Sequence, residues 1–328
     1  MNRNNLVHRI KNVNYNDFDN LALDVFQYQY SKNKVYRAWV DNCKIEPSSI
    51  HSIQDIPFLP ISAFKHHKVV SFKGDYEEVF TSSGTTGSNT SKHFVSDASF
   101  YLFNTQRLFE TSYGPLEDIC FLALLPAYKE RQGSSLVKMV DYFISKSNHS
   151  ESGYFLYDHH NLENTLNQCK QRAIPTILIG VSFALLDFVD QYAIDFPSLT
   201  VMETGGMKGR RKEITREELH LQLKNGFNIN TIHSEYGMTE LFSQAYSKGD
   251  GLFQSNATMK VFCREVSDPM SSFIQEKMGL VNIIDLANID SCAFIATEDL
   301  GRVYADQSFE VLGRLDTSDI RGCNLMVI

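Results

Sequence analysis

One segment of the 328-residue chain combines the residue types that surround phosphate groups. An apolar stretch expected to form a strand (76–80) runs into Phe80-Thr-Ser-Ser-Gly-Thr-Thr-Gly87. The two glycines permit positive φ and close backbone approach, so consecutive amide and hydroxyl groups can wrap phosphate oxygens. The Walker A pattern does not occur here, and the alternative is a polar surface turn. The candidate phosphate ligands are Thr81, Ser82, Ser83, Gly84, Thr85, Thr86 and Gly87.

Four further motifs follow this loop along the chain. They are Glu203-Thr-Gly-Gly206, Tyr236-Gly-Met-Thr-Glu240, Thr297-Glu-Asp-Leu-Gly301 and Gly313-Arg-Leu-Asp316. Together with the loop they make the chain resemble the adenylate-forming superfamily of acyl-CoA synthetases, luciferases and peptide-synthetase adenylation domains. One short match carries little weight, whereas five in the superfamily's order favour shared chemistry.

The resemblance implies ATP and Mg²⁺ as cofactors and assigns a role to each landmark. Gly205, Gly206 and Gly237 belong to turns around the nucleotide, and Tyr236 would stack on adenine. Thr239 would bond the α-phosphate, while Glu240 would hold Mg²⁺, which favours carboxylate and phosphate oxygens. Asp299 would accept both ribose hydroxyls, and Arg314 would hold ribose or phosphate. Taken singly, Glu240, Asp299 and Arg314 also fit ordinary strand-end, turn and surface positions.

Over nearly its whole length the chain is similar to the acyl-protein synthetases of bacterial bioluminescence. The similarity lies in Ile56-Pro-Phe-Leu-Pro-Ile-Ser-Ala-Phe-Lys65, Leu125-Pro-Ala-Tyr-Lys-Glu-Arg-Gln-Gly-Ser-Ser135, Thr204-Gly-Gly-Met-Lys-Gly-Arg210 and Asp319-Ile-Arg-Gly-Cys-Asn324. That family forms acyl-AMP, moves the acyl group to a cysteine near its C-terminus and passes it to a reductase partner. The resemblance implies that Cys323, five residues from the end, is that cysteine, and the neighbouring Arg321 can lower its thiol pKa; the alternative is a buried or incidental cysteine.

One catalytic group of the superfamily is missing from the sequence given. A small C-terminal domain normally supplies a lysine, whereas this sequence stops just after the Gly-Arg-x-Asp region. Lys92 lies two places later than the lysine of the usual loop pattern and is the first substitute. Lys208, Arg210 and Arg211 are others, and a solvated surface charge is the alternative for each of the four.

The periodicity of apolar residues predicts an α/β fold, with one adenylate-forming domain over 1–328. Residues 1–240 would form a parallel α/β body, because short apolar strands alternate there with helices. Residues 241–328 would form a β-rich lobe, with strands near 242–246, 260–266, 280–285, 293–296 and 309–312. From Asp17 to about Cys43 apolar residues recur at helical spacing, so this segment is expected to be helical, followed by an extended, proline-rich stretch.

Composition limits the function classes. The net charge of −8 argues against general nucleic-acid binding, and no apolar run is long enough to span a membrane. No signal peptide begins the sequence, so the cytoplasm is the expected location. The expected function is ATP-dependent conversion of a carboxylic acid, in the first place a fatty acid, to acyl-AMP and then to a thioester. The alternatives are an acyl-CoA or carrier-protein ligase, and a non-catalytic adenylate-binding subunit.

Overall fold

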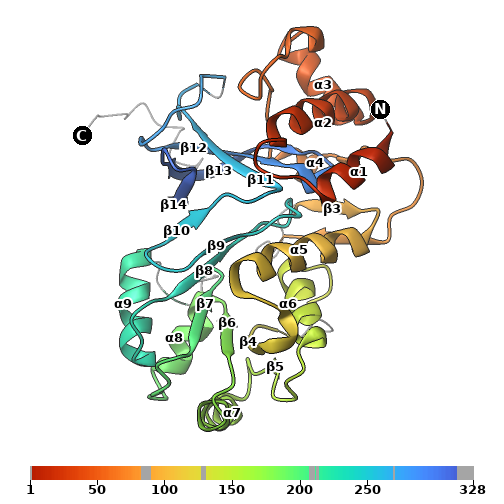
Figure 1. Ribbon diagram of the computed structural model, residues 1–328. Coiled ribbons are helices and arrows are strands. Elements are labelled where there is room, and N and C mark those ends of the chain that lie inside the picture. The colour runs from red at the N-terminus through yellow and green to blue at the C-terminus, as the bar shows by residue number, and fades with distance from the viewer. Residues whose placement is uncertain are drawn as a thin grey trace.

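A 12-stranded mixed sheet runs through the whole protein in the computed structural model (Figure 1). The structure describes residues 2–82, 90–126, 131–206, 211, 214–268 and 270–315. The strand order is β11-β12-β13-β14-β10-β9-β8-β7-β6-β4-β5, with β1 beside β13. The strands are β1 (Leu59–Pro60), β4 (Cys120–Leu124), β5 (Gly153–Tyr154), β6 (Thr176–Gly180), β7 (Thr200–Glu203), β8 (His233–Tyr236), β9 (Ala245–Ser247), β10 (Leu252–Gln254), β11 (Met259–Arg264), β12 (Gly279–Asp285), β13 (Phe294–Val303) and β14 (Ser308–Arg314).

Strands β4 to β8 are parallel and form the α/β half of the sheet. Strands β4 and β6 are buried along their entire length, as expected where helices cover both faces. In Figure 1, α5 and α6 lie on one side of these strands and α8 and α9 on the other. The helices of this half are α5 (Ala98–Tyr113), α6 (Ser135–Lys146), α7 (His159–Gln171), α8 (Ser182–Val189) and α9 (Arg216–Phe227).

The antiparallel half of the sheet packs against the N-terminal helices. One hydrophobic core joins residues from Leu6 to Tyr101 with residues from Tyr236 to Phe309, and a second fills the α/β half. Figure 1 shows this arrangement, with red helices lying beside blue strands. The helices concerned are α1 (Arg3–Lys11), α2 (Phe18–Lys32), α3 (Lys34–Asn42) and α4 (Ala63–His66).

The α/β fold class with a β-rich C-terminal portion is confirmed, and the segment after Asp17 is helical as expected, with one interruption. It forms two helices, α2 and α3, because Asn33 takes an extended backbone between them. The Asn33 side-chain oxygen accepts the N–H groups of Val35 and Tyr36, and its amide donates to the Ser291 carbonyl. A buried contact distant in sequence thus overrides the helical periodicity.

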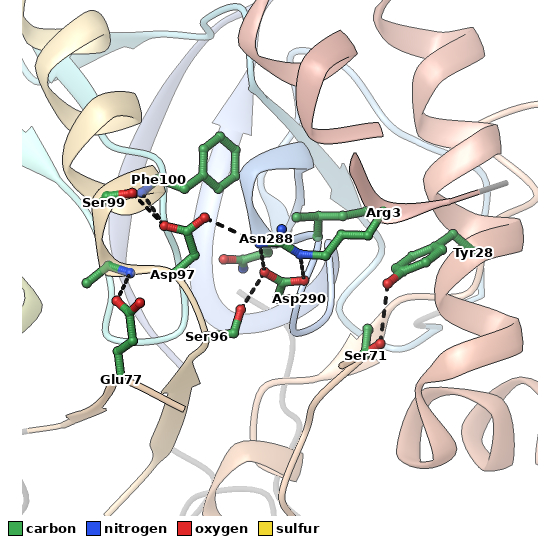
Figure 2. A network of polar contacts seen from close by, with 12 residues as sticks. Arg3, Tyr28, Ser71, Glu77, Ser96, Asp97, Ser99, Phe100, Asn288 and Asp290 are labelled. Carbon is green, nitrogen blue, oxygen red and sulfur yellow. Dashed lines mark hydrogen bonds and ion pairs between the residues drawn. The ribbon is translucent and has the colours of Figure 1, made fainter. Parts of the chain in front are cut away.

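A buried carboxylate links the N-terminal helix to the middle of the chain (Figure 2). Arg3 donates two hydrogen bonds to Asp290, at 2.6 and 2.5 Å, and the Ser96 hydroxyl donates a third at 2.6 Å. Asp97, the next residue, caps α5 by accepting the Phe100 N–H. These contacts fix the strand that precedes α5 against the antiparallel half. That strand, β3 (Lys92–Val95), pairs with β2 (Glu78–Thr81) in a hairpin on either side of the candidate phosphate loop.

Within the described residues, the structure contains no helix with the length and apolar character of a membrane span.

Candidate active site

A cavity of about 300 Å³ lies where the parallel strands β7 and β8 end. Open α/β sheets place their ligand sites at the carboxyl ends of strands, where side chains from several loops converge. The cavity wall includes five of the residues singled out from the sequence: Thr81, Gly205, Gly206, Gly237 and Thr239. The chain between them spans more than 150 positions, so the sequence motifs do meet in space.

The turn after β7 depends on the buried carboxylate of Glu203. Its Oε2 accepts the Gly205 N–H at 2.6 Å, which holds the turn against the strand end. Gly205 and Gly206 have φ values of +71° and +90°, a region that residues with a Cβ rarely adopt. Burial would raise the pKa of Glu203, but contacts from His220, Ser234, Arg216 and the Gly205 amide lower it overall. The glycine pair is therefore required by the backbone, as the motif suggested.

The turn after β8 is clamped from both sides. The His93 ring donates from Nδ1 to the Thr239 carbonyl at 2.9 Å, because a carbonyl can only accept. The Asn288 amide donates to the Glu240 carbonyl at 2.7 Å. Immediately downstream, the Asp285 carboxylate accepts the N–H groups of Phe242 and Ser243 and the Ser243 hydroxyl. Two separate parts of the chain, at His93 and at 285–288, thus hold this turn and the residues that follow it.

His93 should make the stability of the protein depend on pH. Its side chain is 1% exposed, and burial lowers its pKa from 6.5 to about 4. The folded state therefore resists protonation, so this stability is complete above pH 6.5 and is lost as the pH falls towards 4. Between pH 7 and pH 4.5 the wild-type protein should lose unfolding free energy because His93 becomes protonated on unfolding. We expect this loss to be about 2–3 kcal/mol smaller in His93→Gln. Urea unfolding of both proteins at the two pH values measures this difference, and equal pH dependence would contradict the assignment.

Tyr236, Asp299 and Arg314 form a hydrogen-bonded group beside the cavity. The Tyr236 hydroxyl donates to Asp299 Oδ2 at 2.9 Å, and Arg314 Nε donates to Oδ1 at 3.3 Å. Asp299 and Arg314 are directly paired on β13 and β14. Burial raises the pKa of Asp299, while the Arg314 charge and the Tyr236 hydroxyl oppose that rise. The sequence suggested a turn around Asp299, whereas the residue lies inside strand β13.

Glu240 is buried beside Ser91, at the base of the candidate phosphate loop. Burial raises the pKa of its carboxyl, against the opposing hydrogen bond from Ser91 and the charges of Arg314 and Lys65. Thr81 N–H donates to the Gly133 carbonyl at 2.7 Å, and Ser82 and Ser91 bond across the base of the loop. Ser83, Gly84, Thr85, Thr86 and Gly87 lie outside the described residues.

The cationic candidates lie in different places. Lys92 is exposed and lines a second cavity, of about 350 Å³, together with Lys65, His66, His67 and Lys68. Arg211 forms ion pairs with Asp187 and Asp190 on and just after α8. Lys208, Arg210 and Cys323 lie outside the described residues.

Two charged residues of the main cavity were not singled out from the sequence. Arg131 lines the wall, and no hydrogen bond or ion pair joins its guanidinium to another described residue. Glu235 lines the wall from β8. Arg131 lies within the Leu125–Ser135 motif, and Glu235 directly precedes Tyr236 on a strand. Both signals were present in the sequence, but neither residue belongs to the superfamily landmarks.

Comparison with known proteins gives consistent results. Residues 12–97 match the family model described as "Acyl-protein synthetase, LuxE". The long-chain-fatty-acid–luciferin-component ligase of Aliivibrio fischeri is 23% identical over 339 residues, covering 94% of this chain and 86% of that protein.

Solved structures show the same fold at low identity. An open conformation of 2-hydroxyisobutyryl-CoA ligase, in complex with 2-HIB-AMP and CoA, superimposes with a TM-score of 0.67 at 11% identity. That match covers 94% of this chain and 77% of the other. ATP-bound MatB from Rhodopseudomonas palustris gives 0.53 at 13% identity, over 74% of this chain and 49% of the other. The chain is therefore a homologue of the LuxE-type acyl-protein synthetases, a ligase with the large-domain fold of adenylate-forming enzymes.

Proposed function

We propose that the protein joins a carboxylic acid to AMP and then transfers the acyl group to a thiol. The observation that carries the proposal is the meeting of Thr81, the Gly205–Gly206 turn and Thr239 around one cavity, next to the Tyr236–Asp299–Arg314 group. A carboxylate oxygen attacks the α-phosphorus of ATP, a new O–P bond forms, and the bond to the β-phosphate oxygen breaks. Pyrophosphate leaves, and no proton transfer is needed because the acid reacts as its carboxylate.

The residues around the cavity supply position and charge for this step. The hydroxyls of Thr81 and Thr239 can donate to phosphate oxygens, and the Arg131 guanidinium can offset negative charge. Donors fixed before the reaction stabilise charge that builds up in the transition state without further reorganisation. Phosphoryl-group chemistry depends mainly on such positioning and charge stabilisation, which is what this site offers.

The nucleotide would lie between the two turns. Its adenine would lie between the Gly205–Gly206 turn and the Tyr236 ring, and its ribose hydroxyls would donate to Asp299. Tyr236 and Arg314 already hold the Asp299 carboxylate, so binding would not have to order it. The Arg314 side chain is 62% exposed, which leaves it able to reach a ribose or phosphate oxygen.

Glu240 fits the role of a magnesium ligand. Its buried carboxyl is costly to ionise alone, and a divalent cation would favour the ionised form. The described residues contain no cluster of three or more metal-ligating side chains. Mg²⁺ commonly binds one or two carboxylates together with substrate phosphates, so Glu240 plus the triphosphate would be sufficient. Bound there, Mg²⁺ would supply charge neutralisation at the phosphates.

The second step would transfer the acyl group to Cys323. A thiolate attacks the acyl carbonyl carbon, the carbon–sulfur bond forms, and the bond to the AMP oxygen breaks; the thiol proton goes to solvent. Arg321, two residues away in sequence, can raise the thiolate fraction of Cys323. The name of the Aliivibrio relative makes fatty acids the first class of substrate to test. A reductase or another acyl-acceptor protein would be the partner, as the resemblance to the acyl-protein synthetases implies.

Two measurements test the proposal. Purified protein with ATP, Mg²⁺ and a broad panel of acids should catalyse acid-dependent ATP–pyrophosphate exchange, which reports the first step alone. Intact-mass analysis should then show a thioester adduct that Cys323→Ala loses, while exchange persists. Exchange without an adduct at Cys323 would indicate a ligase for CoA or a carrier protein. Tight AMP binding with no exchange on any acid would show a non-catalytic subunit and overturn the proposal.

A further inference from the structure

A carboxyl group without a partner among the described residues lies in the wall of the main cavity. Strand β8 alternates, so Ser234 and Tyr236 are buried on one face while Glu235 lies on the other. There it shares the cavity wall with Tyr101 of α5 and Met139 of α6. No hydrogen bond or ion pair joins its carboxyl to another described residue. A Cβ at position 237 would lie 2.4 Å from Glu235 Oε1, so Gly237 leaves the space that this carboxyl occupies.

A second unpaired acceptor lies next to it. Gln244 also lines the cavity, is 4% exposed, and approaches the same side of Gly237, at 3.4 Å from the Cβ position to Gln244 Cγ. Its Nε2 donates to the Phe242 carbonyl at 3.3 Å, which assigns the other atom as the oxygen. That oxygen, Oε1, is buried and has no hydrogen-bond partner among the described residues. Two side chains beside Gly237 thus carry acceptors that no described residue satisfies.

The cavity therefore disfavours a plain aliphatic ligand. Covering a polar group with hydrocarbon and leaving it without a hydrogen bond costs about 1–3 kcal/mol, and more if the group is charged. An unsubstituted alkyl chain would incur this cost at Glu235 and would leave Gln244 Oε1, which is already buried, without a partner. A ligand with its own N–H or O–H donors would satisfy both groups and gain affinity.

We propose that the acid activated at this site carries a hydrogen-bond-donating substituent, an amino or a hydroxyl group, which Glu235 and Gln244 recognise. This assignment rests on the proposed function, since it names the class of acid that the cavity selects. Burial, and then the charge of Glu203, raise the pKa of Glu235 to about 8. An ammonium group would favour its ionised form, whereas a hydroxyl can bond to either form. Sites built to bond a substituent reject analogues that lack it much more strongly than apolar pockets reject an extra methylene.

The test uses acids that differ only in the substituent. Wild-type protein is assayed by ATP–pyrophosphate exchange with matched series in which an unsubstituted acid is compared with its hydroxy and amino derivatives at successive positions. The series covers short and long chains. We expect at least one substituted acid to exceed its unsubstituted parent in kcat/KM by about 10²-fold or more.

Variants locate the discrimination. In Glu235→Leu and in Gln244→Leu the ratio of substituted to unsubstituted acid should fall towards 1, because the acceptor is gone. Glu235→Gln separates the two substituents, because an amide can still accept a hydrogen bond from a hydroxyl but cannot neutralise an ammonium group. In this variant the preference for an amino-substituted acid over its unsubstituted parent should fall, while the preference for a hydroxy-substituted acid should remain. Glu117→Leu, which removes an exposed carboxylate outside the cavity wall, is the matched control and should leave the ratio unchanged.

The possible failures are distinguishable. Robust exchange that is best with unsubstituted acids, and a ratio unaffected by Glu235→Leu, would overturn this inference while leaving acid activation intact. No exchange with any acid would overturn the proposed function and this inference with it. Thermal unfolding of each variant by circular dichroism identifies any that fail to fold. If Glu235→Leu fails to fold, Glu235→Ala, which also removes the carboxyl, provides the deciding ratio.

Discussion

Replacing Glu240 with glutamine should lower acid-dependent ATP–pyrophosphate exchange by about 10²–10³-fold, measured as kcat/KM at fixed Mg²⁺. Glutamine keeps the shape of the side chain but removes the negative charge that would bind the metal. The carboxyl lies within a rigid frame, because His93 and Asn288 hold the main chain of Thr239 and Glu240. The loss should therefore come from the missing charge and not from movement of the turn.

A titration with Mg²⁺ separates this explanation from a general defect. If Glu240 holds the metal, Glu240→Gln should need a higher Mg²⁺ concentration for half-maximal exchange, and Glu240→Asp should recover part of the activity. Glu265→Gln, at an exposed position of the antiparallel half, is the matched control and should behave as wild type. A variant with reduced exchange but an unchanged Mg²⁺ requirement would assign Glu240 another role.

The motifs around this cavity can be recognised in the sequence because each motif is local. The strand–turn units at Glu203–Gly206 and Tyr236–Glu240 carry their own backbone requirements, such as the positive φ of Gly205. Strand β6 (Thr176–Gly180) is also recognisable from the sequence, since a short, wholly buried strand has a clear apolar run.

What the sequence could not predict are contacts between residues far apart along the chain. Tyr236 and Asp299 are 63 residues apart, and His93 and Thr239 are 146 apart. The periodicity of apolar residues along the sequence does not reveal which distant residues contact each other. The short strands β3, β8 and β10 escaped prediction for a related reason: they are stabilised by neighbours in the sheet more than by their own apolar pattern.

The N-terminal helices show the same limit in the packing of the whole molecule. We expected a parallel α/β body over residues 1–240 and a β-rich lobe over residues 241–328. The sheet is parallel from β4 to β8, and its strands from β9 to β14 pair antiparallel. The hydrophobic cores follow another division, because the first hundred residues pack against the antiparallel half. Asn33 illustrates the cause: its bond to Ser291 interrupts a helix that local periodicity would have continued.

Replacing Asp299 with alanine should raise KM for ATP by about 10²-fold. A carboxylate that accepts from two ribose hydroxyls forms two charge-assisted hydrogen bonds, worth about 1.5–3 kcal/mol each. Asp299 is 8% exposed and held by Tyr236 and Arg314, so it would bind ribose without being reordered. The expected change is in nucleotide binding, with a smaller effect on KM for the acid. Steady-state exchange at varied ATP and varied acid measures the two separately.

The nucleotide itself provides the sharper comparison, because 2′-deoxy-ATP lacks one of the two hydroxyls that Asp299 would bind. Wild type should prefer ATP over 2′-deoxy-ATP by about 10-fold in kcat/KM. Asp299→Ala should lose most of that preference, because the variant already lacks the hydrogen bond that the 2′-hydroxyl would make. Glu298→Gln alters the adjacent carboxylate, whose side chain points to the other face of β13, and this variant should keep the wild-type preference for ATP over 2′-deoxy-ATP. Tyr236→Phe keeps the ring but removes one bond to Asp299, so its effect on KM should stay below about 10-fold. If Asp299→Ala discriminated between the two nucleotides as wild type does, Asp299 would not contact the ribose, and its bonds to Tyr236 and Arg314 would serve only to join β13 to β14 and β8.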